Sequence, residues 1–299
     1  MNSARTRLFG ESLARMSDGA QGGPAHDMIV IRPRQATRED LQLFHNERYI
    51  DFVKTSSQSG EGYLDFPDTP AFPGVYEASL YTVGGTLYGL ETMLRGEFHH
   101  FFNPVGGLHH AARDRASGFC VFDDAAIAIS RALRQDGMKK VAYVDIDAHH
   151  GDGVFYGFES DPCVIIADIH EDGRSLFPGT GDASETGRGG AVGTKLNLPL
   201  RAGSGDAEFI EAFDRAYEFL LGLAPEFIFF QCGADGLQGD PLTHLRYSSA
   251  AHAYAARRLH QLAHETCEGR ILAMGGGGYD AKNVDAAWSA VVKELSSCR

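Results

Sequence analysis

The chain has 299 residues, of which 43% are hydrophobic and 22% charged, and its formal net charge at pH 7 is −13. This composition predicts a globular protein with a substantial core and excludes a strongly basic, non-specific nucleic-acid binder. No stretch approaches the ~20 uninterrupted apolar residues of a membrane span, and the five cysteines form no CxxC pair. We therefore expect a soluble, reduced, cytoplasmic protein.

The first part of the chain predicts a mixture of short elements. We expect residues 1–27 to form an N-terminal helix or loop segment and residues 28–299 to form a single domain. MIVIRP (28–33) is typical of a short strand. Thr37 is expected to cap a helix that runs through LQLFHNERYIDFV, with Asp40 at the capping-box position.

The next segment is rich in Ser, Gly, Asp and Pro and predicts a long surface loop over residues 56–75. Residues 75–96 and 122–137 are expected to be helical, and a further helix, DAEFIEAFDRAYEFLLGL, precedes residue 226.

Four apolar runs each end abruptly in charged residues or glycine. They lie at residues 139–150, 163–170, 226–236 and 270–279 and are separated by helical segments. This alternation predicts an α/β fold with a mostly parallel central sheet flanked by helices. Ligands bind beyond the carboxyl ends of the strands in such sheets, so the polar ends should converge on one active site.

The strongest chemical motif follows the first of these runs. Asp145, Asp147 and His149 alternate along an extended segment and should therefore face the same side. Carboxylate and imidazole at a strand end are suitable ligands for catalytic zinc, which takes three N/O ligands and leaves one position for water. Helix capping or surface pairing is the alternative, but residues 145–152 hold three carboxylates and two histidines. We favour the metal site.

Two pairs of adjacent histidines have different contexts. His109 and His110 lie in a glycine-rich turn, GGLHHA, and suit a base and an acid held side by side. His99 and His100 lack such a context and are expected to be structural.

Two further strand ends offer functional groups. Asp235 and Asp240 follow the third run, and spacing alone does not choose between them as a carboxylate ligand. The fourth run ends in GGGGY (275–279). Its glycines allow a close approach of backbone to ligand, and the Tyr279 hydroxyl is placed to donate to an oxyanion.

Together these segments resemble the histone deacetylase superfamily over about residues 28–295. The resemblance rests on GGLHHA (106–111), ASGFCVFDDAAIAI (116–129), VDIDAHHGDGV (144–154), IHEDGRSLFPGTGD (169–182), GDPL (239–242) and GGGGY (275–279). The IHEDGRSLFPGTGD loop is similar to the bacterial acetoin-utilisation branch. The resemblance implies the arginase/deacetylase-like fold and zinc-dependent hydrolysis of an N-acetyl amide, with acetyl-lysine as the first candidate substrate.

The resemblance also implies roles for individual residues. It implies one catalytic Zn²⁺ bound by Asp147, His149 and Asp240. It implies that His110 is the general base and then acid, that His109 is its electrostatic partner, and that Tyr279 is the oxyanion donor. Asp145 and Asp152 match the carboxylates that hydrogen-bond the two histidines, and Asp145 also matches part of a structural K⁺ site.

For the substrate, the resemblance implies a narrow apolar channel and a rim carboxylate. Gly118, Phe119 and Phe177 match the channel, and Asp68 matches the carboxylate. The implied partner is acetylated lysine in a protein or peptide, or another acetylated amine, with no nucleic acid, no membrane and no assigned oligomeric state.

Two departures from the family pattern are visible. The family has a further N-terminal strand before the segment that corresponds to residue 5. Asp123 stands where asparagine is common, and we expect it to have a paired surface role.

Three alternatives stay open. A small-molecule deacylase of the acetylpolyamine type would use the same zinc site. A two-manganese ureohydrolase would need further Asp/His clusters. A non-catalytic acetyl-ligand binding protein is disfavoured by the presence of every implied ligand, both histidines and Tyr279.

Overall fold

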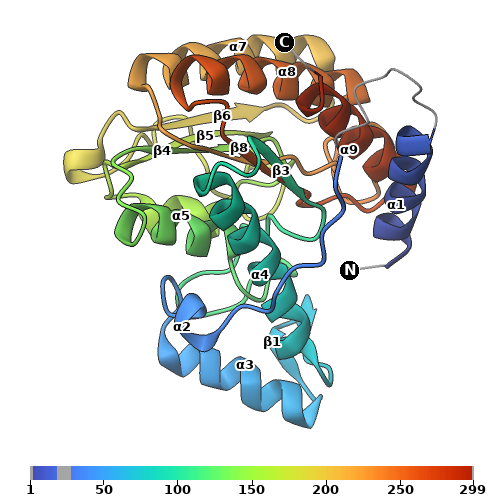
Figure 1. The fold of residues 1–299 in the computed structure, drawn as a ribbon, viewed down its shortest axis with the longest axis vertical. Coiled ribbons are helices and arrows are strands. Elements are labelled where there is room, and N and C mark those ends of the chain that lie inside the picture. The colour runs from blue at the N-terminus through green and yellow to red at the C-terminus, as the bar shows by residue number, and fades with distance from the viewer. Residues whose placement is uncertain (1–2, 19–27, 298–299) are drawn as a thin grey trace.

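Six strands pair in parallel into one central sheet in a computed structural model, which describes residues 3–18 and 28–297. In their order across the sheet they are β3 (His100–Asn103), β8 (Ile271–Met274), β7 (Ile228–Gln231), β4 (Val141–Asp145), β5 (Val164–Glu171) and β6 (Lys195–Leu200). Every neighbouring pair is parallel, so all carboxyl ends lie at one edge of the sheet (Figure 1). The expected α/β fold is confirmed, and the four apolar runs form its four central strands.

Two strands of this sheet, β3 and β6, were not predicted from the sequence, and they are its edge strands. Central strands of a parallel sheet are covered on both faces and read as continuous apolar runs. β3 (HFFN) and β6 (KLNLPL) instead carry polar residues and are only partly buried. Polar residues and proline are usual at sheet edges, where they discourage pairing with another chain. They also interrupt the apolar run by which a strand is recognised in the sequence.

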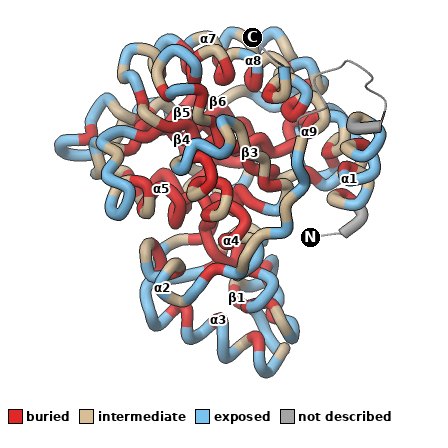
Figure 2. The backbone as a smooth tube through the Cα atoms, viewed as in Figure 1, coloured by how far each residue is buried: buried red, intermediate tan, exposed pale blue. Residues whose placement is uncertain are grey.

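Helices cover both faces of the sheet (Figures 1 and 2). Along β4, Ala142 and Val144 join one hydrophobic cluster and Val141 and Tyr143 join the other, as the two-residue period of a strand requires. The first face is covered by α1 (Ser3–Asp18), α7 (Asp206–Leu223), α8 (Ser249–Thr266) and α9 (Ala281–Leu295). The second is covered by α2 (Arg38–Leu41), α3 (Glu47–Ser59), α4 (Val75–Leu94), α5 (Asp124–Arg134) and α6 (Asp152–Phe158).

The expected strand at residues 28–33 is wrong. Residues 28–36 belong to no helix or strand, and the side chains of Ile29 and Val30 are 68% and 89% exposed. The β-branched residues favour an extended backbone, but residues 28–33 pair with neither of the edge strands, β3 and β6.

The helix expected from Thr37 onward is correct at its start and wrong in its length. Thr37 and Asp40 form the predicted capping box, but α2 ends at Leu41. Asn46 then caps a new helix, α3, by accepting a 2.8 Å hydrogen bond from the Tyr49 N–H. Asparagine competes with helical backbone for hydrogen bonds and favours cap positions.

The segment expected to be a surface loop is partly ordered into a hairpin. It contains the end of α3, then β1 (Tyr63–Asp65) paired antiparallel with β2 (Thr69–Pro70). A short 3₁₀ helix, Gly189–Ala191, lies between β5 and β6. None of the helices within residues 3–18 and 28–297 combines the length and apolarity needed to cross a membrane.

The N-terminal helix α1 is part of the same core as the sheet. Phe9 is 1% exposed and lies edge-on to Phe102 and Trp288, with ring centroids 5.4 Å away in each case. Residues 19–27, which complete the predicted N-terminal segment, lie outside the described residues.

We predict that Phe9→Ala lowers the free energy of unfolding by about 3–5 kcal/mol, the usual cost of emptying a buried phenylalanine site. Denaturant unfolding monitored by circular dichroism measures the change. Glu11→Ala, an exposed position on the same helix, is the control and should change stability by less than about 0.5 kcal/mol. Equal stability of the two variants would show that α1 does not pack on the domain in solution.

Candidate active site

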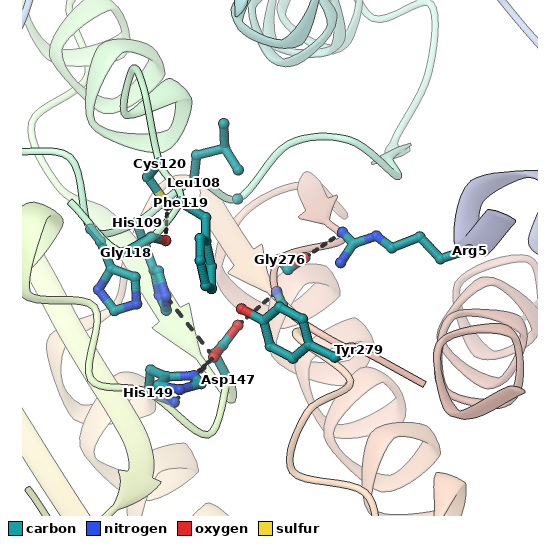
Figure 3. Close-up of a pocket in the computed structure, with 13 residues that line it drawn as sticks. Arg5, Leu108, His109, Gly118, Phe119, Cys120, Asp147, His149, Gly276 and Tyr279 are labelled. Carbon is teal, nitrogen blue, oxygen red and sulfur yellow. Dashed lines mark hydrogen bonds and ion pairs between the residues drawn. The ribbon is translucent and has the colours of Figure 1, made fainter. Parts of the chain in front are cut away.

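A pocket lies beyond the carboxyl ends of the central strands, where the sequence predicts it (Figure 3). It receives residues from the turn after β3, from the segments after β4 and β8, and from α1. Its lining consists of Arg5, Gly107, Leu108, His109, His110, Gly118, Phe119, Cys120, Asp147, His149, Gly276, Gly277 and Tyr279.

Each histidine of the predicted pair contacts the predicted carboxylate. His109 Nδ1 lies 2.7 Å from Asp145 Oδ2, and His110 Nδ1 lies 2.7 Å from Asp152 Oδ1. The two imidazole rings are adjacent, with centroids 4.0 Å apart. Because each Nδ1 faces a carboxylate, each Nε2 is the atom left for chemistry.

The two rings nevertheless have opposite electrostatics. Burial disfavours the charged form of His109, but the charges of Asp145 and Asp147 outweigh it and hold its pKa well above the ordinary value. Burial, and then the positive charge of His109, lower the pKa of His110 to about 4. At neutral pH His109 is therefore charged, and His110 is a neutral base.

A candidate metal centre lies beside the histidine pair. One ligand atom each of Asp147, His149 and Asp235 lies within 4.8 Å of the others, and all three residues are buried. His149 Nδ1 is 3.1 Å from Asp147 Oδ1 and 3.0 Å from Asp235 Oδ2. Burial and the nearby charge of Asp147 raise the pKa of Asp235 to about 7. Two buried carboxylates this close repel each other, and a bound cation would compensate their charge. The mixed nitrogen and oxygen donors suit zinc.

Asp240, the carboxylate that the resemblance favours, occupies a different position. It is 7% exposed, and its two oxygens accept backbone N–H groups from Leu242 at 2.9 Å and from Tyr279 at 2.8 Å. Each carboxylate oxygen keeps a second lone pair after such a bond, so these contacts orient Asp240 without removing its capacity to bind a metal.

Aromatic side chains stand at the pocket, with Phe119 and Tyr279 in its lining and Phe177 beside it, against the His110 ring. Phe119, Phe177 and Tyr279 are each 37–46% exposed. The Phe119 ring lies 5.9 Å from that of Tyr279, and Phe177 lies 5.1 Å from His110. Gly118 has φ +52°, and a Cβ there would come within 2.5 Å of the His110 ring, so only glycine fits. Burial raises the pKa of the Tyr279 hydroxyl, which therefore stays protonated and able to donate.

The predicted rim carboxylate lies farther out. Asp68 is exposed in the turn between β1 and β2 and does not line the pocket within the described residues. The adjacent Thr69 connects this turn to the aromatic rim, because its Oγ1 accepts a 3.2 Å hydrogen bond from the Phe119 N–H.

The expected surface role of Asp123 is wrong. Asp123 is fully buried and caps α5, with its Oδ1 accepting a 2.8 Å hydrogen bond from the Ala126 N–H. Aspartate and asparagine are both strong N-cap residues, which explains how either fits at this position.

Sequence reasoning also missed Asp124, which holds the histidine turn. Its Oδ1 accepts backbone N–H groups from Gly107 at 3.0 Å and Leu108 at 2.9 Å. The only sequence signal was a second carboxylate at the start of a predicted helix, close behind a glycine-rich turn.

The second missed residue is Arg5, which reaches the pocket from α1. Its guanidinium donates to the carbonyl oxygens of Gly278 at 2.9 Å and Gly276 at 2.6 Å, and its side chain is buried (Figure 3). It thereby ties the N-terminal helix to the glycine run before Tyr279. One arginine near a chain end carries no sequence signal of such a contact.

Comparisons with known proteins give one family and several relatives. A family model described as the histone deacetylase domain matches residues 1–295. The acetoin utilization protein AcuC of Bacillus subtilis is 42% identical over 278 residues, covering 90% of this chain and 72% of that protein. Histone deacetylase RPD3 of Saccharomyces cerevisiae is 32% identical over 270 residues, covering 87% and 60%. The crystal structure of the HDA15 HD domain superimposes with a TM-score of 0.86 at 31% identity, over 97% of this chain and 83% of that one.

Proposed function

The chain belongs to the histone deacetylase family, which supports deacetylase activity, and from that premise we propose that it hydrolyses the amide of acetylated lysine. The observation that carries the proposal is the pair of adjacent histidines, each with Nδ1 on a carboxylate, beside a carboxylate–imidazole centre. Amide hydrolysis needs a neutral base for water and a proton donor for the departing amine, and one histidine can serve as both in turn.

We propose that zinc is held by Asp147, His149 and Asp235, whose ligand atoms converge, in place of Asp240. Asp240 would then stand behind the site, where its two oxygens accept the Leu242 and Tyr279 N–H groups and position Tyr279. A bound zinc ion supplies Lewis acidity and lowers the pKa of its water toward ~7. A structural K⁺ near Asp145 stays a prediction.

In the proposed mechanism, His110 Nε2 accepts a proton from the attacking water while the water oxygen bonds to the amide carbon. The protonated ring then gives that proton to the nitrogen as the C–N bond breaks, which releases acetate and the free amine. His109 stays charged throughout. The Tyr279 hydroxyl donates to the oxyanion that forms on the carbonyl oxygen.

The aromatic rim supports a lysine side chain as substrate. Phe119 and Phe177 stand at the mouth of the pocket and offer apolar faces to a four-methylene stem. Asp68, near that mouth, is proposed to contact the substrate backbone. An acetylated polyamine shares the stem and the amide, so it is the alternative substrate class.

We predict that the zinc-loaded protein releases acetate from acetyl-lysine peptides and that a hydroxamate chelator inhibits the release. The experiment compares a panel of acetyl-lysine peptides with acetylated polyamines, with zinc content verified beforehand. Preference for polyamines would replace lysine by the alternative substrate. If zinc is bound and no substrate of the panel releases acetate, the proposed deacetylation is contradicted.

We predict that His110→Ala loses turnover by roughly 10²–10⁴-fold, the usual range for general acid–base catalysis. Tyr279→Phe should lose roughly 10²–10³-fold, as for one oxyanion donor. Steady-state kinetics on an acetyl-lysine peptide measure both, with His99→Ala, an exposed histidine, as the control. An unchanged rate for His110→Ala would eliminate it as the base.

The Asp152–His110 contact predicts a shift in pH dependence. The Asp152 carboxylate raises the pKa of His110 against burial and against His109, so Asp152→Asn should lower that pKa further. A base is active when unprotonated, and its activity falls as the pH falls through its pKa. The acidic limb of kcat/KM should therefore move to lower pH while the plateau falls, by roughly 10²-fold. The control is Asp114→Asn, an exposed carboxylate in the loop that carries His110. A limb that moves to higher pH would contradict this role.

The choice between Asp235 and Asp240 predicts different zinc contents. Asp235→Asn should remove one equivalent of bound zinc per chain, whereas Asp240→Asn should retain it with roughly 10–100-fold lower affinity. Equilibrium dialysis with metal analysis measures both, independently of activity. The reverse result would identify Asp240 as the third ligand.

A further inference from the structure

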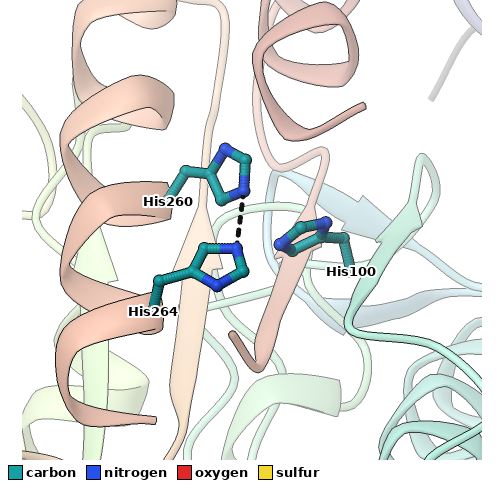
Figure 4. A group of neighbouring side chains, drawn as sticks. All are labelled: His100, His260 and His264. Atoms are coloured by element: carbon teal, nitrogen blue, oxygen red, sulfur yellow. Dashed lines mark hydrogen bonds between the residues drawn. The ribbon is translucent and has the colours of Figure 1, made fainter. Parts of the chain in front are cut away.

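Three histidines gather at the end of the strands opposite to the proposed active site (Figure 4). His100 is the first residue of β3 and pairs with Ile271, the first residue of β8. His260 and His264 lie one turn apart on α8 and therefore share a helix face. Because the strands are parallel, this group lies at their amino ends, away from the pocket at their carboxyl ends.

The imidazole nitrogens of this histidine cluster converge. One nitrogen from each ring lies within 4.8 Å of the others, and His260 Nε2 is 2.9 Å from His264 Nε2. The His100 ring stands edge-on to that of His260, with centroids 4.5 Å apart. A zinc ion with bonds of about 2.05 Å to nitrogen separates its ligands by about 3.3 Å. The 2.9 Å contact is shorter than this value, and the 4.8 Å limit of the group is longer. His264 is exposed, so its side chain can move to fit an ion.

The surroundings orient the rings as metal-binding histidines are oriented. His260 Nδ1 lies 3.1 Å from the backbone carbonyl of Glu294, near the end of α9, and donation to that carbonyl makes Nε2 the acceptor that faces His264 Nε2. His100 Nε2 is buried and has no hydrogen-bond partner among the described residues. Burial and the neighbouring rings lower the pKa of His100 to about 3, so its ring is a neutral ligand at physiological pH.

We propose that His100, His260 and His264 bind a second divalent transition-metal ion, with zinc as the expected occupant. Three neutral imidazoles match the preference of borderline cations such as Zn²⁺, whereas Mg²⁺ and Ca²⁺ prefer oxygen. Burial grades from His260, which is buried, to His264, which is exposed, so the ion reaches the site from solvent. The fourth position is open to water.

Such an ion would link the first residue of β3 to the last turns of α8, next to the start of β8 and the end of α9. β3 leads into the turn that carries His109 and His110, and β8 leads into the glycine run before Tyr279. α9 begins just after Tyr279, and its last carbonyls face His260. We therefore expect the second ion to stabilise the fold. This proposal does not depend on the proposed deacetylase function.

The test measures zinc content in an untagged chain, since a polyhistidine tag would itself bind metal. In an Asp147→Ala background, which removes a proposed ligand of the active-site ion, one zinc per chain is expected to remain. Adding His264→Ala should remove it, whereas adding His99→Ala, an exposed histidine next to the cluster in sequence, should not. At about 100 times Kd, zinc should raise Tm by roughly 3–5 °C, and His264→Ala should abolish that shift.

Further controls identify the ligands. His264→Gln keeps a polar side chain of similar size and should lose the ion as His264→Ala does. The series is repeated with Cys298→Ser, because Cys298 lies outside the described residues and its thiol must not be the group detected. Co²⁺ substituted for zinc should give the visible absorption of a nitrogen-ligated site only where the cluster is intact. Equal zinc content and equal Tm shifts with and without His264 would overturn the proposal.

Discussion

The burial of the Asp145 carboxylate at the end of β4 is the constraint on which the rest of the site depends. A charge with no solvent exposure is stable only when it is fully hydrogen-bonded and paired. Asp145 meets this requirement through the His109 ring, the Tyr143 hydroxyl at 2.7 Å and the Asp147 N–H at 3.0 Å. These partners fix the histidine turn against the strand and set the direction in which the chain leaves it toward Asp147 and His149.

This arrangement explains why His109 and His110 differ in charge although each has a carboxylate at Nδ1. Both rings have Nδ1 at 2.7 Å from a carboxylate, and both are buried. His109 also feels the charge of Asp147, whereas His110 feels the positive charge of His109. Burial is the larger cause that keeps the second ring neutral, and the proton on the first ring adds to it. The division into charged partner and base comes from the order of the rings along the sheet edge, since residue type and pairing are the same.

The sequence predicted the centre of this fold and site better than their edges. The central strands are recognisable because both of their faces are buried, which leaves a continuous apolar run followed by the functional residues. β3 and β6, as edge strands, keep a mixed composition, so no pattern separates them from loops. Residues 28–33 show the converse error, because their composition favours a strand but they pair with no strand of the sheet.

Functional residues were predictable where they follow a strand directly and not where tertiary packing brings them in. Arg5 reaches the pocket because α1 packs on α9. Its partner Gly276 lies more than 270 positions away in the sequence. Asp124 acts through the backbone of a turn that precedes it in the chain. The choice between Asp235 and Asp240 depends on side-chain directions within one short loop, which residue spacing does not encode.

The glycine run before Tyr279 shows how the two ends of the chain meet in one catalytic feature. Its backbone polar groups alternate in direction, with the carbonyls of Gly276 and Gly278 turned to Arg5. The N–H groups of Gly277 and Tyr279 are turned to Asp147 and Asp240, each at 2.8 Å. A Cβ at Gly277 would lie 2.3 Å from an Asp235 oxygen, so a side chain there would displace the carboxylates. The Arg5 guanidinium contacts the carbonyl oxygens of the glycine run, and the carboxylates contact its N–H groups. Charges of opposite sign therefore fix the orientation of these peptide groups. The Tyr279 hydroxyl is thus positioned by charge–backbone contacts from α1 and from the metal centre together, and a change in either alters where that donor stands.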